Sequence, residues 1–576
     1  MSSEEDLDDD SRWPARLLHV ETLTSHPWEP GNIYGGYVRP RYNAISYTWG
    51  RFQLPGDQQP EVEAVPIRGT TWEKHLPRIR PESFTVEDML RVITTAAAPH
   101  AGYPAVEFIW LDIACIDQTP NSPEMACEVG RQAMIFRGAV DIFVWLTTLR
   151  SPEIIDWVYD MECLVSEQFT IDQDHTPAAV VSAWIVKAAK LFQVFTADDW
   201  FTSLWTLQEA FLSPKAIFMF RDGLPLSLID TTCMDGEGNI QLPRLNSWAQ
   251  TWYSIKSLVE SLPQYPEGGK LMNTIDCVGF LDGMRNQWLT FALDDLEYPS
   301  DFMGIPFKLL VASKHRTTRY EDDRIYGIMQ VFELRLGKSA PGASGDDFSL
   351  DELRTQLAAA VLYKYPILSQ LIVQHEDCKP HEAWMISPSM SLPEEASRAW
   401  SHLAFGGDVV CRTSMRTEHF RGRLWAGFSG PVSPLSVWHK AMESQADYVN
   451  TRLLIDRRWT REVPEYDAAT SSGDVKAKFQ WLLSMFDSPS VVFLGCLVPP
   501  EGTKSDRNMN EFYNWGIGLL LTPGREQDFD HYQRIGVLVW KLDLIMSLRK
   551  ATISEDIFVY LNGDGNGWTS SAGLIG

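Results

Sequence analysis

The sequence lacks the features that mark several common classes of protein. Its eight cysteines are far apart and include no CxxC pair, which argues against a zinc ribbon or a dense disulfide framework and favours free thiols in a reducing compartment. No stretch approaches the roughly 18 consecutive apolar residues of a membrane-spanning helix. Residues 1–10 are mostly acidic and lack the basic and apolar regions of a signal peptide. We therefore expect a cytoplasmic protein without a membrane span.

Basic residues are also scarce. The chain has 50 Lys and Arg against 76 Asp and Glu, and its formal net charge is -26. The densest basic cluster, Arg452, Arg457, Arg458 and Arg461, is interrupted by Asp456. Because such a surface repels phosphate backbones, we expect no nucleic acid partner.

Nucleotide-loop and metal motifs are missing as well. Gly337-Lys338-Ser339 ends like a Walker A loop, but Phe332 stands where its first glycine should be. There is no HExxH motif, and the twelve histidines are scattered without metal-ligand spacing. The sequence therefore predicts no metal site and no permanently bound cofactor.

What the chain has is length and aromatic residues. Its 576 residues are too many for one hydrophobic core and predict two or three domains. Its 22 tryptophans predict large buried aromatic clusters. We expect an acidic disordered tail over residues 1–15, a first domain over 16–225, a helical extension over 226–345 and an α+β region over 346–576. The helical spacing in the extension covers 248–262, 271–288 and 316–334, and residues 337–347 have the composition of a linker. Helix 350–364 follows, and the last region contains strand candidates at 409–414, 422–428, 491–497, 516–521 and 534–540.

The first domain alternates strands with helices. Strands are expected at 16–23, 42–50, 106–112, 141–146 and 215–220, and helices at 85–98, 124–138, 151–195 and from Ser203 onward. The last four strands are almost continuously apolar, which is typical of a parallel sheet covered by helices on both faces. Ligands of such doubly wound sheets lie beyond the carboxyl ends of the strands. The fold class predicted is therefore α/β, and residues 46–50 and 112–118 are placed at the ligand-binding edge.

One group of polar residues follows the strand at 106–112. It contains Asp112, Cys115, Asp117 and Gln118, and Glu128 and Gln132 lie beyond it, one helical turn apart. The simpler interpretation is structural: Asp112 or Asp117 caps backbone groups in a buried loop, and Gln132 satisfies others. A cysteine nucleophile paired with a distant histidine is an alternative for Cys115, although packing is the commoner role of such a cysteine.

A second group combines Ser203, Trp205, Gln208 and Glu209 in one apolar stretch. Trp205 and Glu209 are four residues apart and share a helix face. If Glu209 faces bulk solvent, it is an ordinary helix residue. If it faces a cleft, burial raises its pKa and makes it a candidate acid, base or stabiliser of a positive charge.

Three segments together resemble the fungal heterokaryon-incompatibility (HET) domain. The first is Tyr42-Asn43-Ala44-Ile45-Ser46-Tyr47-Thr48-Trp49-Gly50, and the third is Trp205-Thr206-Leu207-Gln208-Glu209. The second comprises Trp110-Leu111-Asp112, Cys115-Ile116-Asp117-Gln118, Glu128, Gln132, Ile135-Phe136 and Ala139. Residues 323–329 also look like the segment that usually follows this domain. The third motif usually has arginine two residues before its first tryptophan, where this chain has Ser203.

The third segment is also similar to the third box of TIR domains, of which HET domains are thought to be distant relatives. That resemblance implies a TIR/flavodoxin-like parallel sheet and, through Glu209, cleavage of NAD at the nicotinamide-ribose bond. Thr206 replaces the cysteine of the TIR box, and the loop after the first strand of the sheet is different. In this hypothesis NAD is a substrate and not a permanently bound cofactor.

The resemblance implies a protein of fungal non-self recognition and regulated cell death. Two hypotheses remain open: hydrolysis of NAD with Glu209, and a non-catalytic module that acts by self-assembly or by binding other incompatibility proteins. In the first, Glu209 is catalytic, and Glu128 and Gln132 are structural. The candidate pocket residues are Ser46, Tyr47, Trp49, Gly50, Asp112, Cys115, Asp117, Gln118, Ser203, Trp205 and Gln208.

Overall fold

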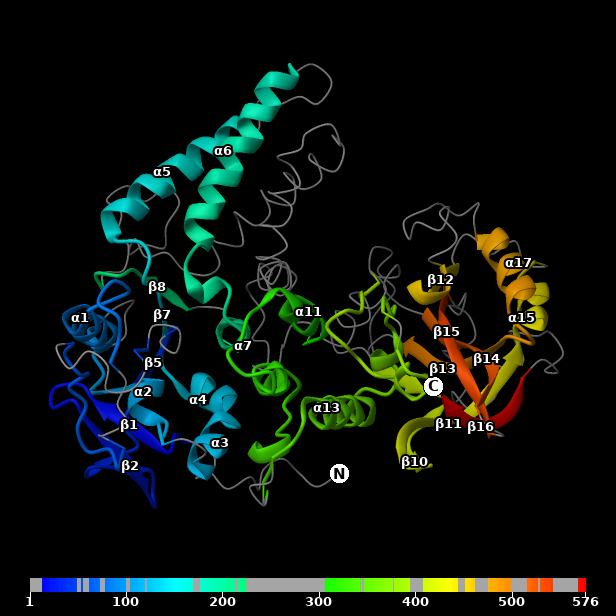
Figure 1. Ribbon diagram of the computed structural model, residues 1–576, viewed down its shortest axis with the longest axis horizontal. Helices are drawn as coiled ribbons and strands as arrows, with labels where there is room; N and C mark the ends of the chain where they lie inside the picture. Colours follow the sequence, from blue (N-terminus) through cyan, green and yellow to red (C-terminus); the bar gives the residue numbers. More distant parts are fainter. Residues whose placement is uncertain are drawn as a thin grey trace. The chain divides into compact units, whose positions relative to one another are not determined.

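A computed structural model of the chain shows two compact units, Met1–Leu353 and Arg354–Gly576 (Figure 1). The residues that it describes are 13–48, 53–54, 62–72, 78–99, 104–119, 122–168, 177–212, 216–223, 306–341, 343, 347–376, 378–393, 408–443, 451–460, 475–498, 515–526, 529–541 and 568–575. The helices expected at 248–262 and 271–288, and nearly all of the acidic tail, lie outside these residues.

Four parallel strands form the centre of the first unit. They are β5 (Tyr42–Ser46), β6 (Phe108–Trp110), β7 (Ile142–Trp145) and β8 (Ile217–Met219). Their order in the sheet is β6-β5-β7-β8, and Ala44 is paired with Trp110 on one side and Ile142 on the other. Nearly all their residues are buried, which explains the continuous apolar runs in the sequence. The expected four strands are confirmed.

An antiparallel extension makes this sheet mixed rather than purely parallel. β1 (Arg16–His19) pairs antiparallel with β6, and β2 (Thr24–Glu29), β3 (Ile33–Tyr34) and β4 (Tyr37–Val38) continue outward from it. Gly35 and Gly36, with φ of 57° and 93°, form the tight turn between β3 and β4. The strand expected at 16–23 is thus present but belongs to a meander that the sequence pattern did not reveal.

Helices surround the parallel strands. α1 (Val86–Ala97) begins with a capping box between Thr85 and Asp88, and it contacts β5 and β6. The helix expected at 124–138 is divided into α3 (Pro123–Val129) and α4 (Gln132–Gly138), preceded by the short α2 (Asp112–Cys115). α5 (Ser151–Gln168) and α6 (Ala178–Thr196) form a hairpin, and the 3-10 helix η4 (Asp199–Phe201) leads into α7 (Leu204–Leu212).

Residues 306–353 belong to the same unit. They contain α11 (Pro306–Ala312), η5 (Ser313–His315), α12 (Asp323–Tyr326), η6 (Met329–Phe332) and η7 (Gly337–Ser339). The long helix suggested by the spacing at 316–334 is not formed, and only short helical turns occur there. The predicted linker also differs, because Gly337 and Ser339 are buried.

The second unit is built on an antiparallel sheet. α13 (Leu350–Lys364) crosses the boundary between the units, and η8 (Leu368–Gln370) and η9 (Pro380–Glu382) follow. The strand order is β10-β11-β16-β15-β14-β13-β9, and β11 also pairs with β13, so that the pairings form a closed circuit; β12 pairs with β15. The strands are β9 (Asp408–Cys411), β10 (Ser414–Phe420), β11 (Arg423–Pro434), β12 (Thr451–Ile455), β13 (Ser490–Val498), β14 (Trp515–Glu526), β15 (Phe529–Lys541) and β16 (Thr569–Ile575). α15 (Leu435–Glu443), α16 (Arg457–Thr460) and α17 (Val475–Met485) accompany the sheet. The strand candidates of this region are confirmed, and most of the strands are longer than expected.

Among the described residues, none of the helices is both long and apolar enough to cross a bilayer.

Candidate functional site

Glu209 is the central group of the candidate site. It lies on α7 and is only 8% exposed. The hydroxyl of Ser46, the last residue of β5, donates a hydrogen bond of 2.5 Å to Oε2 of Glu209. Nε1 of Trp200 in turn donates to Oγ of Ser46 at 2.8 Å. Ser46 is 163 positions from Glu209 and 154 from Trp200 in the sequence, and the three residues form one buried hydrogen-bonded chain.

Burial changes the ionisation of Glu209. It raises the pKa of this carboxyl group to about 8, the neighbouring Asp112 carboxylate adds to the rise, and the Ser46 hydrogen bond opposes it. Glu209 is therefore mostly protonated at neutral pH. A carboxyl group that titrates near neutrality is suited to proton transfer, which an ordinary surface glutamate is not.

The sheet explains why these groups meet. β5 lies between β6 and β7, and the chain leaves β5 toward β6 but then crosses to β7 on the other side. In open parallel sheets the carboxyl ends of strands at such a reversal form the usual ligand-binding crevice. Ser46 and Tyr47 are at the end of β5, and Asp112 follows β6.

Tyr47 and Asp112 interact at this edge. Burial raises the pKa of Tyr47 well above its ordinary value, and Asp112 adds to that rise. Oδ1 of Asp112 also accepts a hydrogen bond from the backbone N–H of Ile113 at 2.6 Å, at the start of α2. The Tyr47 ring stacks on Trp145 from the end of β7, with ring centroids 5.5 Å apart. Ser46, Tyr47, Asp112 and Glu209 thus form one electrostatically coupled group.

Trp200 is held in place by Asp198, a residue that lies outside the three sequence motifs. Asp198 is 2% exposed, and its carboxylate accepts hydrogen bonds from the backbone N–H groups of Trp200 at 2.9 Å and Thr147 at 2.7 Å. These bonds fix η4 to the end of β7. An aspartate just before a short helix is a typical capping residue, so the sequence position of Asp198 could have identified it as the N-cap of η4.

Arg316 anchors the other side of the same stretch. Its Nη1 donates hydrogen bonds to the carbonyl groups of Trp200 at 3.1 Å and Ser203 at 3.2 Å, and Arg316 is buried. Ser203 itself forms a short β-bridge with Thr317. This chain has Ser203 where the motif has arginine, and a buried guanidinium reaches the stretch from residue 316 instead.

Gln330 forms hydrogen bonds with α3, α4 and α7, the helix that carries Glu209. Its side-chain oxygen accepts from the backbone N–H of Ala133 at 2.5 Å, and its amide nitrogen donates to the carbonyl of Val129. Both backbone groups flank the break between α3 and α4. The backbone N–H of Gln330 donates to Oε1 of Gln208 at 3.3 Å, so the neighbour of Glu209 is tied to this contact. Gln132 is buried at the start of α4.

Trp205 faces a different partner from the one its spacing suggested. Asp323, at the start of α12, is hydrogen-bonded to Trp205, and its Oδ2 accepts from Thr318 at 2.8 Å. Trp200 is the tryptophan that contacts Ser46.

Asp117 and Gln118 bind within their own loop. Oδ1 of Asp117 accepts from the N–H of Thr119 at 2.8 Å, and Oδ2 accepts from Ser122 at 2.6 Å. Gln118 donates to the carbonyl groups of Ile116 and Asp112. These bonds stabilise the loop between α2 and α3.

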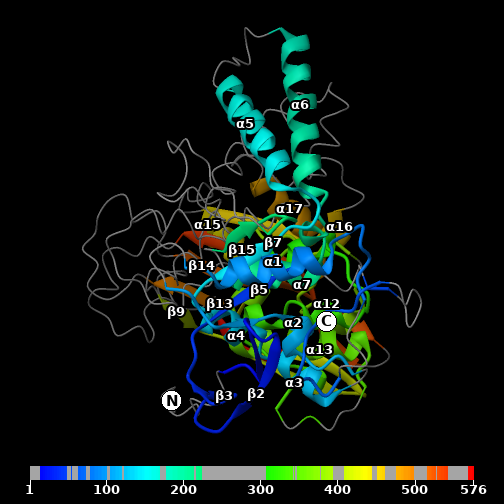
Figure 2. The ribbon, with the colours of Figure 1, turned by 90° about the vertical axis from the view of Figure 1, so that its left-hand side faces the viewer.

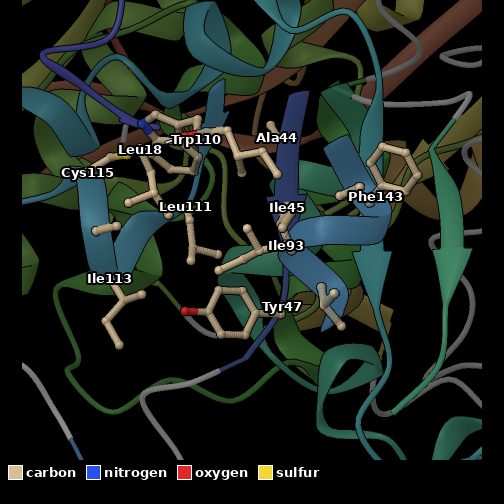
Figure 3. Packing of buried hydrophobic residues seen from close by; sticks show 14 of the residues in the cluster. Leu18, Ala44, Ile45, Tyr47, Ile93, Trp110, Leu111, Ile113, Cys115 and Phe143 are labelled. Carbon is tan, nitrogen blue, oxygen red and sulfur yellow. Dashed lines mark hydrogen bonds between the residues drawn. The ribbon is translucent and has the colours of Figure 1, made fainter. Parts of the chain in front are cut away.

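Cys115 and Glu128 are buried away from Glu209's hydrogen bonds. Cys115 lies in the hydrophobic cluster with Leu111 and Tyr47 (Figure 3), and burial raises its pKa to about 12. Burial and the raised pKa favour the packing role of Cys115 over the nucleophile alternative. Glu128 accepts a hydrogen bond from the N–H of Ala15 at 2.9 Å and so holds the segment before β1.

Trp49 and Gly50, the remaining pocket candidates, lie outside the described residues. Within the residues that the structure describes, no group of three or more His, Cys, Asp or Glu is arranged to hold a metal ion.

Residues 42–209 match the family model described as Heterokaryon incompatibility protein (HET). The match begins at the first residue of β5 and ends at Glu209, and it confirms the resemblance drawn from the three motifs. No curated protein and no solved structure is similar enough to this chain to be matched. Residues 42–209 of this chain are therefore similar to the HET family.

Proposed function

We propose that this chain acts in fungal non-self recognition and regulated cell death, and that its HET domain does so by hydrolysing NAD in the cytoplasm. The observation that carries the proposal is the buried, hydrogen-bonded Glu209 at the carboxyl end of β5, with its pKa raised to about 8. The order of the four parallel strands supports it, because β6-β5-β7-β8 is the order of flavodoxin-like doubly wound sheets.

The chemistry depends on how the charge of Glu209 responds to the substrate. NAD carries a positive charge on its nicotinamide ring, and cleavage of the nicotinamide-ribose bond develops positive charge on the ribose. A positive charge within a few ångströms favours the ionised carboxylate. Binding of the substrate at the end of β5 would therefore lower the pKa of Glu209 and leave a carboxylate facing the developing cation.

Ser46 and Trp200 then act as positioning residues. The Trp200 N–H occupies one lone pair of the Ser46 hydroxyl, which directs the hydroxyl hydrogen toward Glu209. This arrangement fixes the position of the Glu209 carboxyl group before the substrate arrives, as preorganised electrostatic stabilisation requires.

The experiment expresses the full chain in a host cell and follows viability and NAD, with Glu209→Gln as the matched isosteric variant. We expect NAD loss to precede cell death in the wild type and both to be abolished by Glu209→Gln. Cell death with unchanged NAD would refute hydrolysis, and loss of NAD in the variant would refute the role of Glu209.

The pH dependence gives a second readout on purified protein. For a carboxylate that must be ionised, kcat/KM rises with pH and levels off above the pKa of the free enzyme, near pH 8. The inflection of kcat lies at lower pH, because the bound cation favours ionisation.

A non-catalytic signalling module is the second candidate. The 8% exposure of Glu209 favours it, since a sealed carboxyl group in a hydrogen-bonded chain also serves as a structural contact. In this case the chain acts by self-assembly or partner binding, and Glu209→Gln leaves cell death intact.

A further inference from the structure

We propose that the α5–α6 hairpin assembles copies of this chain head to tail, with the outer face of α6 on one copy binding the outer face of α5 on the next. The hairpin is antiparallel and extends away from the sheet of its unit (Figures 1 and 2). Nε1 of Trp157 donates to the carbonyl of Leu191 at 2.7 Å, and Nε1 of Trp184 donates to the carbonyl of Leu164 at 3.1 Å. These residues define the inner face of each helix.

The outer face of α6 is exposed and combines apolar residues with a lysine. Val186 and Val194 are 46% and 41% exposed, and Lys190, also exposed, lies between them at a spacing of four residues. Ala188, which is buried on the inner face, is two residues from Lys190, and two residues correspond to about 200° around a helix. The stripe of Val186, Lys190 and Val194 therefore points away from α5.

α5 carries a matching outer face. Ile155 and Tyr159 are 41% and 68% exposed, and each is two residues from Trp157, whose indole binds α6. Asp156 and Asp160 are exposed beside them. Large apolar side chains recur at helical spacing on the outer side of both helices, and exposed apolar stripes of this kind mark protein interfaces.

Charge selects the partner. α5 contains Glu153, Asp156, Asp160, Glu162 and Glu167 and has neither Lys nor Arg. α6 contains Lys187 and Lys190 and has neither Asp nor Glu. Lys187 pairs with Glu167 of α5 within the hairpin at 2.9 Å, so Lys190 supplies the positive charge of the outer face of α6, and Asp156 and Asp160 supply the negative charge of the outer face of α5. Contact between two α5 helices sets acidic against acidic side chains, whereas α6 against α5 of a second copy joins opposite charges.

This pairing cannot close as a two-fold dimer. Each copy uses its α6 face for one neighbour and its α5 face for another, so the interface is heterologous and produces a ring or an open filament. The second copy of this chain is thus the partner that fits the surface. The inference does not depend on hydrolysis by Glu209.

The test uses two blocked variants of the full-length protein. In one, Val186→Glu and Lys190→Glu make the α6 face acidic. In the other, Ile155→Glu and Tyr159→Glu add charge to the α5 face. Because all four positions are exposed, the fold is retained, and circular dichroism and melting temperature check this. Tyr363→Ser, at an 89% exposed tyrosine on α13, is the control.

Sedimentation velocity over a range of concentrations measures the assembly. We expect the wild type and Tyr363→Ser to form species larger than a dimer, and each blocked variant to remain a monomer at concentrations at least tenfold higher. An equimolar mixture of the two variants forms a pair of chains and nothing larger, because one intact α5 face meets one intact α6 face.

A chain carrying Lys190→Glu with Asp156→Lys and Asp160→Lys restores assembly if opposite charges select the contact. A wild type that stays monomeric, blocked variants that assemble normally, or a mixture that does not pair would each overturn the proposal.

Discussion

Two buried carboxyl groups, Asp456 in the second unit and Glu209 in the first, have different hydrogen-bond partners. Asp456, which follows β12, is 0% exposed, and its Oδ2 accepts a hydrogen bond of 3.1 Å from Nε of the equally buried Arg534. Its Oδ1 accepts from the N–H of Gln374 at 3.0 Å. Glu209 has the neutral hydroxyl of Ser46 at 2.5 Å. A full opposite charge compensates Asp456, whereas Glu209 meets a neutral donor.

The difference lies in what each carboxyl group is bonded to. Arg534 also donates to the carbonyl groups of Gln370 and Ile372, so the Asp456–Arg534 pair ties residues 370–374 to β15. Burial raises the pKa of Asp456 as it does that of Glu209, but at Asp456 the charge of Arg534 opposes the rise. Glu209 can change its charge within the physiological pH range, and that is the property expected of a reactive site.

The largest effect is expected from breaking the compensated pair. Arg534→Met leaves Asp456 buried without its counter-charge, and the free energy of unfolding should fall by about 3–5 kcal/mol in urea denaturation. Arg416→Met is the matched control, because Arg416 forms an exposed pair with Glu418 on β10 worth less than ~1 kcal/mol.

Replacing both partners, with Arg534→Met and Asp456→Leu, should recover most of the loss, since no buried charge then remains. An Arg534→Met protein as stable as Arg416→Met would contradict the assignment of this pair.

The second effect is the pH dependence of stability that Glu209 imposes. The folded chain holds the Glu209 proton up to about pH 8, whereas the unfolded chain releases it near 4.5. The stabilisation is complete below pH 4.5 and declines as the pH rises toward 8, by at most roughly 1.4 kcal/mol per pH unit.

Glu209→Gln has no proton to lose, so its unfolding free energy should decline less steeply over this window. Glu87→Gln, at an exposed position on α1, provides the comparison and should retain the wild-type slope. Equal slopes in all three proteins would mean that Glu209 is ionised in the folded chain.

A third, smaller effect concerns the support behind the site. Gln330→Ala leaves the buried N–H of Ala133 and the carbonyl of Val129 without this partner and should cost about 1–3 kcal/mol. Gln330→Glu should cost more, because a carboxylate oxygen replaces the donor that faces Val129. Unfolding in urea distinguishes them, and wild-type stability in both variants would exclude a role for this side chain.

The smallest effect is expected from Ser46→Ala. It removes the hydrogen bond that opposes the rise in the pKa of Glu209, so the decline in stability should shift to higher pH, with a loss of about 1 kcal/mol. Ser433→Ala removes a buried hydroxyl from the second unit and should leave the pH of the decline unchanged. A shift to lower pH in Ser46→Ala would show that the hydroxyl stabilises the protonated form.

The parallel core of the first unit could be predicted from the sequence, because strands buried on both faces form continuous apolar runs. It did not reveal the antiparallel β2–β4 meander, whose two-residue strands β3 and β4 are too short for periodicity to register. The break between α3 and α4 was hidden for another reason: it is stabilised by Gln330, 197 residues away from Ala133.

The candidate site could be predicted only where its residues lie in continuous motifs. Ser46 and Glu209 were both selected in this way. Trp200 and Arg316 were not, because their roles arise from contacts across the fold, to the hydroxyl of Ser46 and to the carbonyl of Ser203. Helix spacing paired Glu209 with Trp205, whereas burial of α7 places Trp205 against Asp323.

The most direct measurement of the central claim is NAD hydrolysis by the purified full-length chain at pH 7 to 9, compared with Glu209→Gln. We predict nicotinamide release by the wild type that increases toward pH 8 and above, and a loss of at least a hundredfold in kcat/KM in the variant. Equal rates of nicotinamide release by the two proteins would contradict the account.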